Sequence, residues 1–457
     1  MNRIAGRAVI TLVLALVLVA GLGFFVCEYF FNAGDWAVFQ GNPHVYNAGN
    51  IGCGSVVSRE ETDLLQISDT REYASDALLR RATLHWLGDR EGNISAPALA
   101  AYAREMTGFD VINGVYSYGG SGGTATLTLS ARAQAAALEA LDGRKGTVAV
   151  YNYKTGEILC AVTSPAYDPD DVPDIAADET GAYDGVYLNR FTQVSYVPGS
   201  IFKVITAGAA LETMPEIRNE TFHCSGEYLV EGNYVTCEDA HGDVDMGEAL
   251  TQSCNCYFAH LAEELGADTL NRFVEQFEVT ESLTFDGITT AEGSVSISDE
   301  DPIGLAWSAI GQHEDLLNPC RFMTFMGAIA GGGSAAEPYV VSQIKVGHSN
   351  TYTVKTTQTD TIMSPETARL LQDFLRDNVI YKYGDENFPG LTVCAKSGTA
   401  EVGGDQKPNA VFAGFVQDAQ YPLAFIAVVE NGGYGRSVCV PILSEVLAVC
   451  KDVMDGE

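Results

Sequence analysis

The stretch Pro198-Gly199-Ser200-Ile201-Phe202-Lys203 is the most informative part of this sequence. Proline and glycine are typical of the turn that opens a helix, so we predict a helix from about Ser200 to Glu212. Residues three apart share a helical face, which brings the Lys203 amine within reach of the Ser200 hydroxyl. A serine needs a neighbouring base, and a lysine can serve when burial or another cation lowers its pKa. The stretch therefore predicts Ser200 as a nucleophile and Lys203 as its base.

The same letters occur a second time in a setting that argues against function. Ser342-Gln343-Ile344-Lys345 also fits the pattern SxxK. Residues 339–346, however, have the composition of a β-strand, in which residues three apart point to opposite faces. We therefore predict that this second match is structural.

A third stretch, Ser253-Cys254-Asn255, is the only SxN in the chain. The Ser253 hydroxyl suits a proton relay, and the Asn255 amide suits a substrate carbonyl. Taken alone, the pattern is more typical of a polar cluster at the end of a helix.

A fourth stretch, Lys396-Ser397-Gly398-Thr399, lies in a predicted strand near the end of the chain. Lys396 supplies positive charge, Ser397 and Thr399 supply hydroxyls for a carboxylate, and Gly398 allows a substrate backbone to approach. The similar run Lys154-Thr155-Gly156 joins two predicted strands of a hairpin, so we interpret it as a turn.

The pattern of apolar residues predicts an α+β fold in which a sheet packs against helices. The predicted strands are Thr147–Tyr153, Glu157–Thr163, Thr392–Glu401, Ala410–Val416 and Leu423–Glu430, and the predicted helices are 131–141, 200–212, 247–280 and 440–453.

The N-terminus is predicted to anchor the chain in a membrane. Residues Ala8 to Cys27 carry no charge and are long enough to cross a bilayer as one helix. Arg3 and Arg7 precede this run, so the positive charge favours a cytoplasmic N-terminus with the rest of the chain outside the cytoplasm. The run is longer than a signal-peptide core, which favours an uncleaved anchor over residues 1–31.

Composition excludes some classes of function. The net charge is −34, which argues against nucleic-acid binding because that function needs a basic surface. The 11 cysteines include no CxxC pair, so we expect no zinc site and no other metal. We expect most cysteines to be buried apolar residues, and leave open a disulfide between Cys224 and Cys237. His313-Glu314 begins an HExxH pattern, but Leu317 stands where the second histidine belongs.

The order SxxK, SxN and KSG resembles that of penicillin-binding proteins and serine β-lactamases. Over residues 124–457 the chain resembles class B penicillin-binding proteins, the peptidoglycan D,D-transpeptidases. This resemblance implies an antiparallel sheet packed with helices, behind an anchor (1–31) and a short pedestal domain (32–123). Further stretches that carry it are Gly146–Leu159, Ser164–Pro169, Asn189-Arg190 and Phe412–Phe415, and more weakly Gly54–Arg59 and His85–Asp89.

The resemblance also implies roles for the site residues. Ser200 would be acylated by stem peptides and β-lactam antibiotics, Lys203 would take its proton, and Ser253 and Lys396 would pass a proton to the leaving group. Asn255 would hold the donor amide, and Ser397, Gly398 and Thr399 would bind the terminal carboxylate. No cofactor is implied. A polytopic peptidoglycan glycosyltransferase is the implied partner, and roles in elongation, division or sporulation all stay open.

Several alternatives use the same residues or nearby ones. A D,D-carboxypeptidase would replace the acceptor amine by water. A serine β-lactamase would need a deacylating base, for which Glu314-Asp315-Leu316-Leu317-Asn318 imitates an ExxLN motif, although Gly311-Gln312 and Asn318-Pro319 fit a penicillin-binding loop. An esterase could use Ser121 in GxSxG, but a strand follows where a helix is needed. A receptor that senses β-lactams would need more cytoplasmic or membrane sequence than Met1–Arg7 and one helix supply. A non-enzymatic scaffold would leave the intact catalytic set unexplained.

Overall fold

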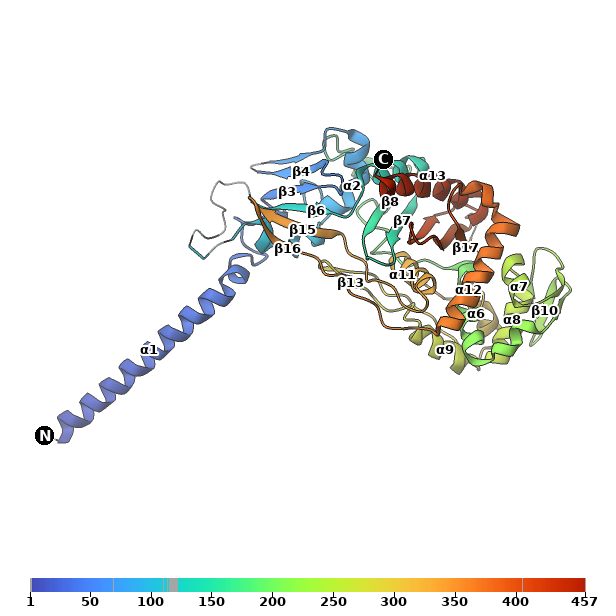
Figure 1. Cartoon of the computed structure of the whole chain (residues 1–457), viewed down its shortest axis with the longest axis horizontal. Helices are drawn as coiled ribbons and strands as arrows, with labels where there is room; N and C mark the ends of the chain where they lie inside the picture. The colour runs from blue at the N-terminus through green and yellow to red at the C-terminus, as the bar shows by residue number, and fades with distance from the viewer. Residues whose placement is uncertain are drawn as a thin grey trace.

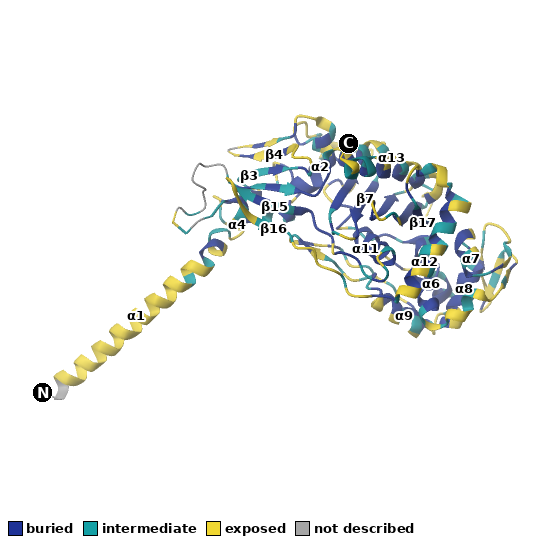
Figure 2. Ribbon diagram, viewed as in Figure 1, coloured by how far each residue is buried: buried dark blue, intermediate teal, exposed yellow. Residues whose placement is uncertain are grey.

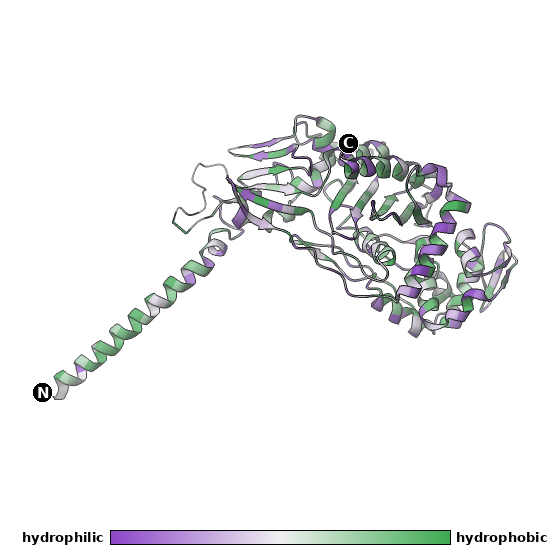
Figure 3. Cartoon of the chain, viewed as in Figure 1, coloured by the Kyte–Doolittle hydropathy of each residue, from purple (hydrophilic) through white to green (hydrophobic). Residues whose placement is uncertain are grey.

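The computed structural model describes residues 2–68, 70–109, 111–112, 114, 122–404 and 406–456. Its first helix, α1 (Asn2–Ala37), projects from one end of the molecule (Figure 1). The helix is exposed over most of its length (Figure 2) and predominantly apolar (Figure 3), and from Ile4 to Ala37 it is long and apolar enough to cross a membrane. The uncharged run predicted as an anchor lies inside it, although the helix ends at Ala37, later than the expected limit at residue 31.

A six-stranded sheet lies next to this helix, in the order β16-β15-β6-β3-β4-β5. Its strands β3, β4 and β5 come first in the chain. Strand β6 follows them and pairs in parallel with β3. Strands β15 and β16 lie more than 200 residues further along the sequence, and β15 pairs with β6. The sheet thus combines segments from both sides of residue 123, and the division into domains at residues 31 and 123 stays a prediction. The strands are β3 (Gly54–Val57), β4 (Asp63–Ile67), β5 (Arg71–Tyr73), β6 (Thr124–Leu127), β15 (Val341–Val346) and β16 (Ser349–Thr353).

Helix α2 (Ala77–Leu87) follows β5 in the chain and contacts residues 161 and 186, which lie outside the six-stranded sheet. Asp76 caps the helix by accepting the Leu79 N–H at 2.8 Å. Near its other end, Trp86 Nε1 donates to the Ala161 carbonyl at 2.6 Å, and His85 Nε2 lies 2.8 Å from the Val186 carbonyl oxygen. The two side chains are buried, so the helix joins the two regions through satisfied polar contacts.

The second sheet has five antiparallel strands in the order β17-β18-β19-β7-β8. Side chains alternate between its faces, and both faces are buried. Val148 and Val150 belong to the cluster with helices α5 and α13, whereas Ala149 and Tyr151 belong to the cluster that includes helix α11. The bounds are β7 (Gly146–Asn152), β8 (Ile158–Ser164), β17 (Val393–Ala400), β18 (Asn409–Val416), β19 (Leu423–Val429), α5 (Ala131–Leu141), α11 (Pro319–Ala330) and α13 (Gly435–Asp455).

A helical part with small ribbons completes the fold, at the end of the molecule farthest from α1 (Figure 1). Two-stranded ribbons pair β9 with β12 and β10 with β11. These elements are α6 (Lys203–Thr213), β9 (Phe222–Cys224), β10 (Glu227–Val230), β11 (Asn233–Thr236), β12 (Gly242–Val244), α7 (Met246–Gln252), α8 (Asn255–Leu265), α9 (Ala267–Gln276), α10 (Pro302–Ser308) and α12 (Pro365–Asn378). Short elements elsewhere are β1 (Tyr46–Asn47), β2 (Asn50–Ile51), α3 (Pro97–Ala100), α4 (Ala103–Met106), β13 (Thr284–Phe285) and β14 (Ile288–Thr289).

The two duplicate motifs lie on the elements predicted for them, a turn and a strand. The Asn152 side-chain oxygen accepts the N–H groups of Lys154 and Thr155 at 2.9 and 3.1 Å, which is the geometry of a side-chain-stabilised turn. Ser342 and Lys345 both lie in strand β15, where Ser342 Oγ donates to the Thr126 carbonyl at 2.8 Å.

Candidate active site

Ser200 lies in a single turn of 3₁₀-helix, Gly199–Phe202, that runs directly into α6 at Lys203. The helix is therefore where it was predicted, with a tighter first turn. Side chains three apart eclipse one another in a 3₁₀-helix, and Lys203 Nζ lies 3.0 Å from Ser200 Oγ. Gly199 has φ +58°, and a Cβ there would come 2.7 Å from the Thr399 carbonyl oxygen. Only glycine lets the turn sit this close to β17.

Lys203 is fully buried and surrounded by polar atoms. Besides Ser200, its Nζ lies 2.7 Å from the Ser253 carbonyl oxygen, 3.1 Å from Ser253 Oγ and 2.6 Å from Asn255 Oδ1. Burial lowers the pKa of the amine to about 8, because the charged form loses hydration that these neighbours only partly replace. An amine with that pKa is partly neutral near physiological pH and can accept a proton from the Ser200 hydroxyl.

Ser253 and Asn255 stand at a break between two helices. Ser253 ends α7 in the left-handed conformation, with φ +56°, and Asn255 is the first residue of α8. This reversal turns the Ser253 hydroxyl toward Lys203 and the Asn255 side chain toward the same amine. Asn255 Nδ2 donates to the Thr236 carbonyl at 2.7 Å, which fixes the orientation of its amide. The pattern is thus a helix end that also contributes to the site.

Lys396 approaches the same serine from the sheet. Its Nζ lies 3.0 Å from Ser253 Oγ and 3.0 Å from the Ser397 carbonyl oxygen, and its side chain is 1% exposed. Burial, with a smaller contribution from the charges of Lys203 and Lys382, holds the pKa of Lys396 well below its usual value. The Ser253 hydroxyl therefore bridges two buried amines and can relay a proton between them.

The end of β17 carries the remaining predicted residues, Ser397, Gly398 and Thr399. Two residues that the sequence did not single out as site residues hold this strand. The Tyr383 hydroxyl lies 3.0 Å from Ser397 Oγ and accepts the Ser397 N–H at 2.9 Å. Gln312 Nε2 donates to the Thr399 carbonyl at 2.6 Å, and its Oε1 accepts the Glu401 N–H at 3.2 Å. Gln312 was visible as part of a loop pattern, whereas no sequence signal marks Tyr383.

The β-lactamase alternative finds little support in this geometry. Glu314 is exposed on the loop between α10 and α11. Asn318, the last residue of the β-lactamase-like pattern, caps α11 by accepting the N–H groups of Cys320 and Arg321 at 3.0 and 3.2 Å. Ser121, the serine of the esterase pattern, lies outside the described residues.

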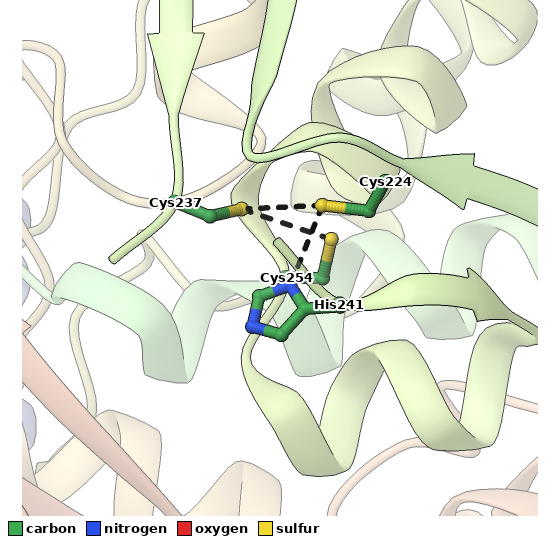
Figure 4. Close-up of side chains that lie close together, drawn as sticks. All are labelled: Cys224, Cys237, His241 and Cys254. Atoms are coloured by element: carbon green, nitrogen blue, oxygen red, sulfur yellow. Dashed lines mark hydrogen bonds between the residues drawn. The ribbon is translucent and has the colours of Figure 1, made fainter. Parts of the chain in front are cut away.

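The cysteines that are scattered in sequence are partly gathered in space. All 11 are free thiols, and the Sγ atoms of Cys224 and Cys237 lie 3.9 Å apart, so the disulfide that the sequence left open is not formed. Ligand atoms of Cys224, Cys237, Cys254 and His241 all lie within 4.8 Å of one another (Figure 4). The expectation of no metal site considered spacing along the chain, and it missed this convergence.

A serine with a buried lysine base, a second buried lysine and a hydroxyl-lined strand define a serine acyltransferase site on an α+β fold. The sequence matches the penicillin binding protein transpeptidase domain over residues 146–448, and the chain belongs to this family. It is a class B penicillin-binding protein, a group of serine-type D-Ala-D-Ala transpeptidases.

Individual relatives agree with this assignment. Peptidoglycan D,D-transpeptidase PbpA of Mycobacterium tuberculosis is 32% identical over 369 residues, which is 74% of this chain and 73% of that protein. Stage V sporulation protein D of Bacillus subtilis is 28% identical over 325 residues, 66% of this chain and 48% of that protein.

Solved structures show the same fold. The D,D-transpeptidase domain of a peptidoglycan glycosyltransferase from Eggerthella lenta superposes with a TM-score of 0.75 at 24% identity, over 88% of this chain and 98% of that one. The imipenem acyl-enzyme complex of penicillin-binding protein A from M. tuberculosis superposes with a TM-score of 0.69 at 25% identity, over 87% of this chain and 98% of that one.

Proposed function

We propose that this chain cross-links peptidoglycan stem peptides through an acyl-enzyme on Ser200. The observation that carries the proposal is the buried Lys203 amine, 3.0 Å from Ser200 Oγ and in contact with both polar residues of the SxN motif. A serine hydroxyl becomes an effective nucleophile when such a base takes its proton as the bond to carbon forms.

In the acylation step, Ser200 Oγ attacks the carbonyl of the penultimate D-Ala while neutral Lys203 accepts the hydroxyl proton. The N–H groups of Ser200 and Thr399 stabilise the negative charge that develops on the carbonyl oxygen. Ser253, bonded to both amines, passes a proton to the leaving D-Ala nitrogen, and Lys396 assists that transfer. The peptide bond is replaced by an ester, and one D-Ala departs.

Substrate binding falls to the remaining residues. Asn255 holds the amide of the donor peptide, the hydroxyls of Ser397 and Thr399 bind the terminal carboxylate, and Gly398 leaves room for the peptide backbone. The amine of a second stem peptide then attacks the ester to form the cross-link. A β-lactam would use the same contacts and stop at the ester.

Placement in the cell follows from the first helix. We propose that α1 is a single-pass anchor with Arg3 and Arg7 in the cytoplasm, so that the catalytic region lies outside the cytoplasm. The segments 32–123 and 124–457 would then act as pedestal and transpeptidase domain. A polytopic peptidoglycan glycosyltransferase that supplies nascent glycan is the proposed partner.

The test is a cross-linking assay with the full-length protein in detergent, a pentapeptide-bearing donor and an amine acceptor, followed by mass spectrometry. We expect one D-Ala released for each cross-link formed, and neither product with Ser200→Ala. Release of D-Ala without cross-links would identify a carboxypeptidase instead, and catalytic hydrolysis of penicillin would identify a β-lactamase.

A further inference from the structure

The strand that carries Lys396, Ser397 and Thr399 has one open side. Strand β17 lies at one end of the five-stranded sheet and pairs there with β18. In an edge strand, alternate residues turn their N–H and C=O groups away from the sheet, and such groups need other partners where they are buried. The partners along this edge show how the substrate-binding hydroxyls are held.

Both ends of the edge are held by side chains from other segments. Arg376 Nη1 donates to the Val393 carbonyl at 3.0 Å, and Asn378 Nδ2 donates to the Ala395 carbonyl at 2.9 Å. These two donors come from α12 and hold the start of the strand. Gln312 holds its end through the carbonyl of residue 399. The middle of the edge is left to one further contact.

That contact comes from Tyr383, the last residue of a π-helical turn (Val379–Tyr383) that directly follows α12. Turns of this kind are frequent at functional sites. The Tyr383 hydroxyl accepts the Ser397 N–H at 2.9 Å and lies 3.0 Å from Ser397 Oγ. Tyr383 is 5% exposed, and its ring packs edge-on against Phe412 with 5.1 Å between the ring centroids. The phenol is therefore fixed by packing at its ring and by Ser397 at its hydroxyl.

The hydrogens of the two hydroxyls follow from a count of donors and acceptors. A tyrosine hydroxyl carries one hydrogen, which it donates, and its oxygen accepts others. Tyr383 Oη already accepts the Ser397 N–H, and within the described part of the chain its other hydrogen-bond partner is Ser397 Oγ. The Tyr383 O–H therefore donates to Ser397 Oγ. The hydrogen of Ser397 then points away from Tyr383, and no group among the described residues accepts it.

The surroundings of this pair favour an anion as the acceptor. Lys396 precedes Ser397, and the charge of Lys382 reaches Lys396. Burial raises the pKa of Tyr383, with the charge of Arg436 acting in the opposite direction, so the phenol keeps its hydrogen at neutral pH. A carboxylate carries negative charge and accepts hydrogen bonds, and it fits such a position.

We propose that Tyr383 is a positioning residue for the terminal carboxylate of the donor peptide, which rests on the proposed role of Ser397 in binding that carboxylate. The Tyr383 hydroxyl donates to Ser397 Oγ and thereby turns the Ser397 hydrogen toward the substrate. A hydroxyl that accepts one hydrogen bond also donates a stronger one, because the two bonds polarise each other. Without Tyr383, the Ser397 hydroxyl is free to rotate, and part of its contact with the carboxylate is lost.

The test compares penicillin G with its methyl ester, which has the same ring system but no carboxylate. Tyr383→Phe in the full-length protein in detergent removes the hydroxyl and keeps the ring. We expect the second-order acylation constant to fall about tenfold for penicillin G and less than about twofold for the methyl ester. The matched control is Tyr381→Phe, because Tyr381 lies in the same turn but is 73% exposed. This control should leave both constants within about twofold of the wild type.

The two compounds separate a positioning role from a merely structural one. A general distortion of β17 would slow acylation by both compounds equally, and that result would overturn the role of Tyr383, as would unchanged constants for both. A second measurement adds Tyr383→Phe to Ser397→Ala. The added change should then cost less than about twofold with penicillin G, because the hydroxyl that Tyr383 orients is already gone. A full tenfold loss in that background would also overturn the role.

Both constants describe formation of the ester, so they do not depend on whether an amine or water later removes it. Wild-type protein that is acylated by neither compound would refute the proposed function itself, and this role with it. Equal losses for the two compounds in Tyr383→Phe would refute the role of Tyr383 alone. The constant for the methyl ester also reports how much of each variant is folded and active.

Discussion

The two sides of the active site are held in place by different means. On one side, Lys396 and the residues after it lie on β17, which pairs with β18 along its whole length from Val393 to Ala400. On the other side, Ser253 and Asn255 lie in a short turn between α7 and α8 beside two small ribbons. A sheet between two packed helical layers fixes the first side, whereas a few hydrogen bonds and the cysteine cluster fix the second.

This contrast shows where the site is sensitive. The strand side draws its order from buried apolar packing, which single polar substitutions on its surface barely disturb. The turn side depends on individual contacts, among them Lys203 to Ser253 and Asn255 to Thr236. Ser200 and Lys203 stand between the two sides and need both.

The largest expected effect comes from removing the nucleophile. Ser200→Ala should abolish labelling by fluorescent penicillin, a loss of more than about a thousandfold, because no other group replaces its hydroxyl. Ser342→Ala is the matched control, since it removes a serine from an identical SxxK pattern on a strand. Peptide mapping should find the label only on Ser200. A label on Ser342, or persistent labelling of Ser200→Ala, would refute the assignment.

Removing the base should be nearly as severe. We expect Lys203→Met to slow acylation by about a hundredfold to ten-thousandfold, the range typical of general-base catalysis. In the wild type the base must be neutral, and burial lowers the pKa of Lys203 to about 8. The acylation rate should therefore rise with pH up to about 8 and level off above it. A rate constant that does not change from pH 6 to pH 10, measured by stopped flow, would contradict this role.

A smaller effect is expected on the strand side. Gln312→Ala removes two hydrogen bonds that hold the end of β17, to Thr399 and Glu401. We expect this variant to be acylated about tenfold more slowly, which corresponds to a loss of about 1.4 kcal/mol in transition-state binding. The melting temperature should change little, because the packing of β17 stays intact. A loss as large as that of Lys203→Met would show that this side is as sensitive as the turn.

Much of the fold and site followed from local patterns in the sequence. The hairpin of β7 and β8, helix α6 and the last three strands lie where apolar alternation and turn residues predicted them. The candidate catalytic motifs could be assigned because each one lies on the kind of element that its proposed chemistry needs: the start of a helix for SxxK, a helix end for SxN and a strand for KSG. The two duplicate motifs failed the same requirement, which is why the sequence could reject them.

Contacts between distant segments were beyond the sequence. Strand β15 pairs with β6, which in turn pairs with β3. Because β6 and β15 are over 200 residues apart, their pairing leaves no local pattern in the sequence. Tyr383 reaches Ser397 from a turn with no motif of its own. The cluster of Cys224, Cys237, His241 and Cys254 was missed for a related reason: its members are close in sequence but in no regular spacing, and the small ribbons bring their side chains together.

The smallest expected effect concerns the fate of the acyl-enzyme. Fast hydrolysis requires a base aimed at a water molecule next to the ester. Glu314 is the residue that a β-lactamase-like pattern offers, yet it is exposed on its loop, and Asn318 of the same pattern caps α11. The neighbouring Asp315 is buried, which raises its pKa to about 7, and it accepts a hydrogen bond from Ser308 Oγ at 3.2 Å. Asp315 is therefore hydrogen-bonded to a residue of α10, and this contact gives it no role in hydrolysis of the ester.

We therefore expect a long-lived penicillin adduct whose lifetime changes by less than about twofold in Glu314→Ala, since a base that does not contact the ester contributes nothing to its hydrolysis. Intact-protein mass spectrometry after a pulse of penicillin measures the decay, and Glu314→Gln serves as the matched variant of equal size. Decay within seconds in the wild type, slowed at least about a hundredfold by Glu314→Ala, would mean that Glu314 provides roughly 2.7 kcal/mol of transition-state stabilisation. In that case the loop after α10 would belong to the catalytic site, and the chain would be a β-lactamase.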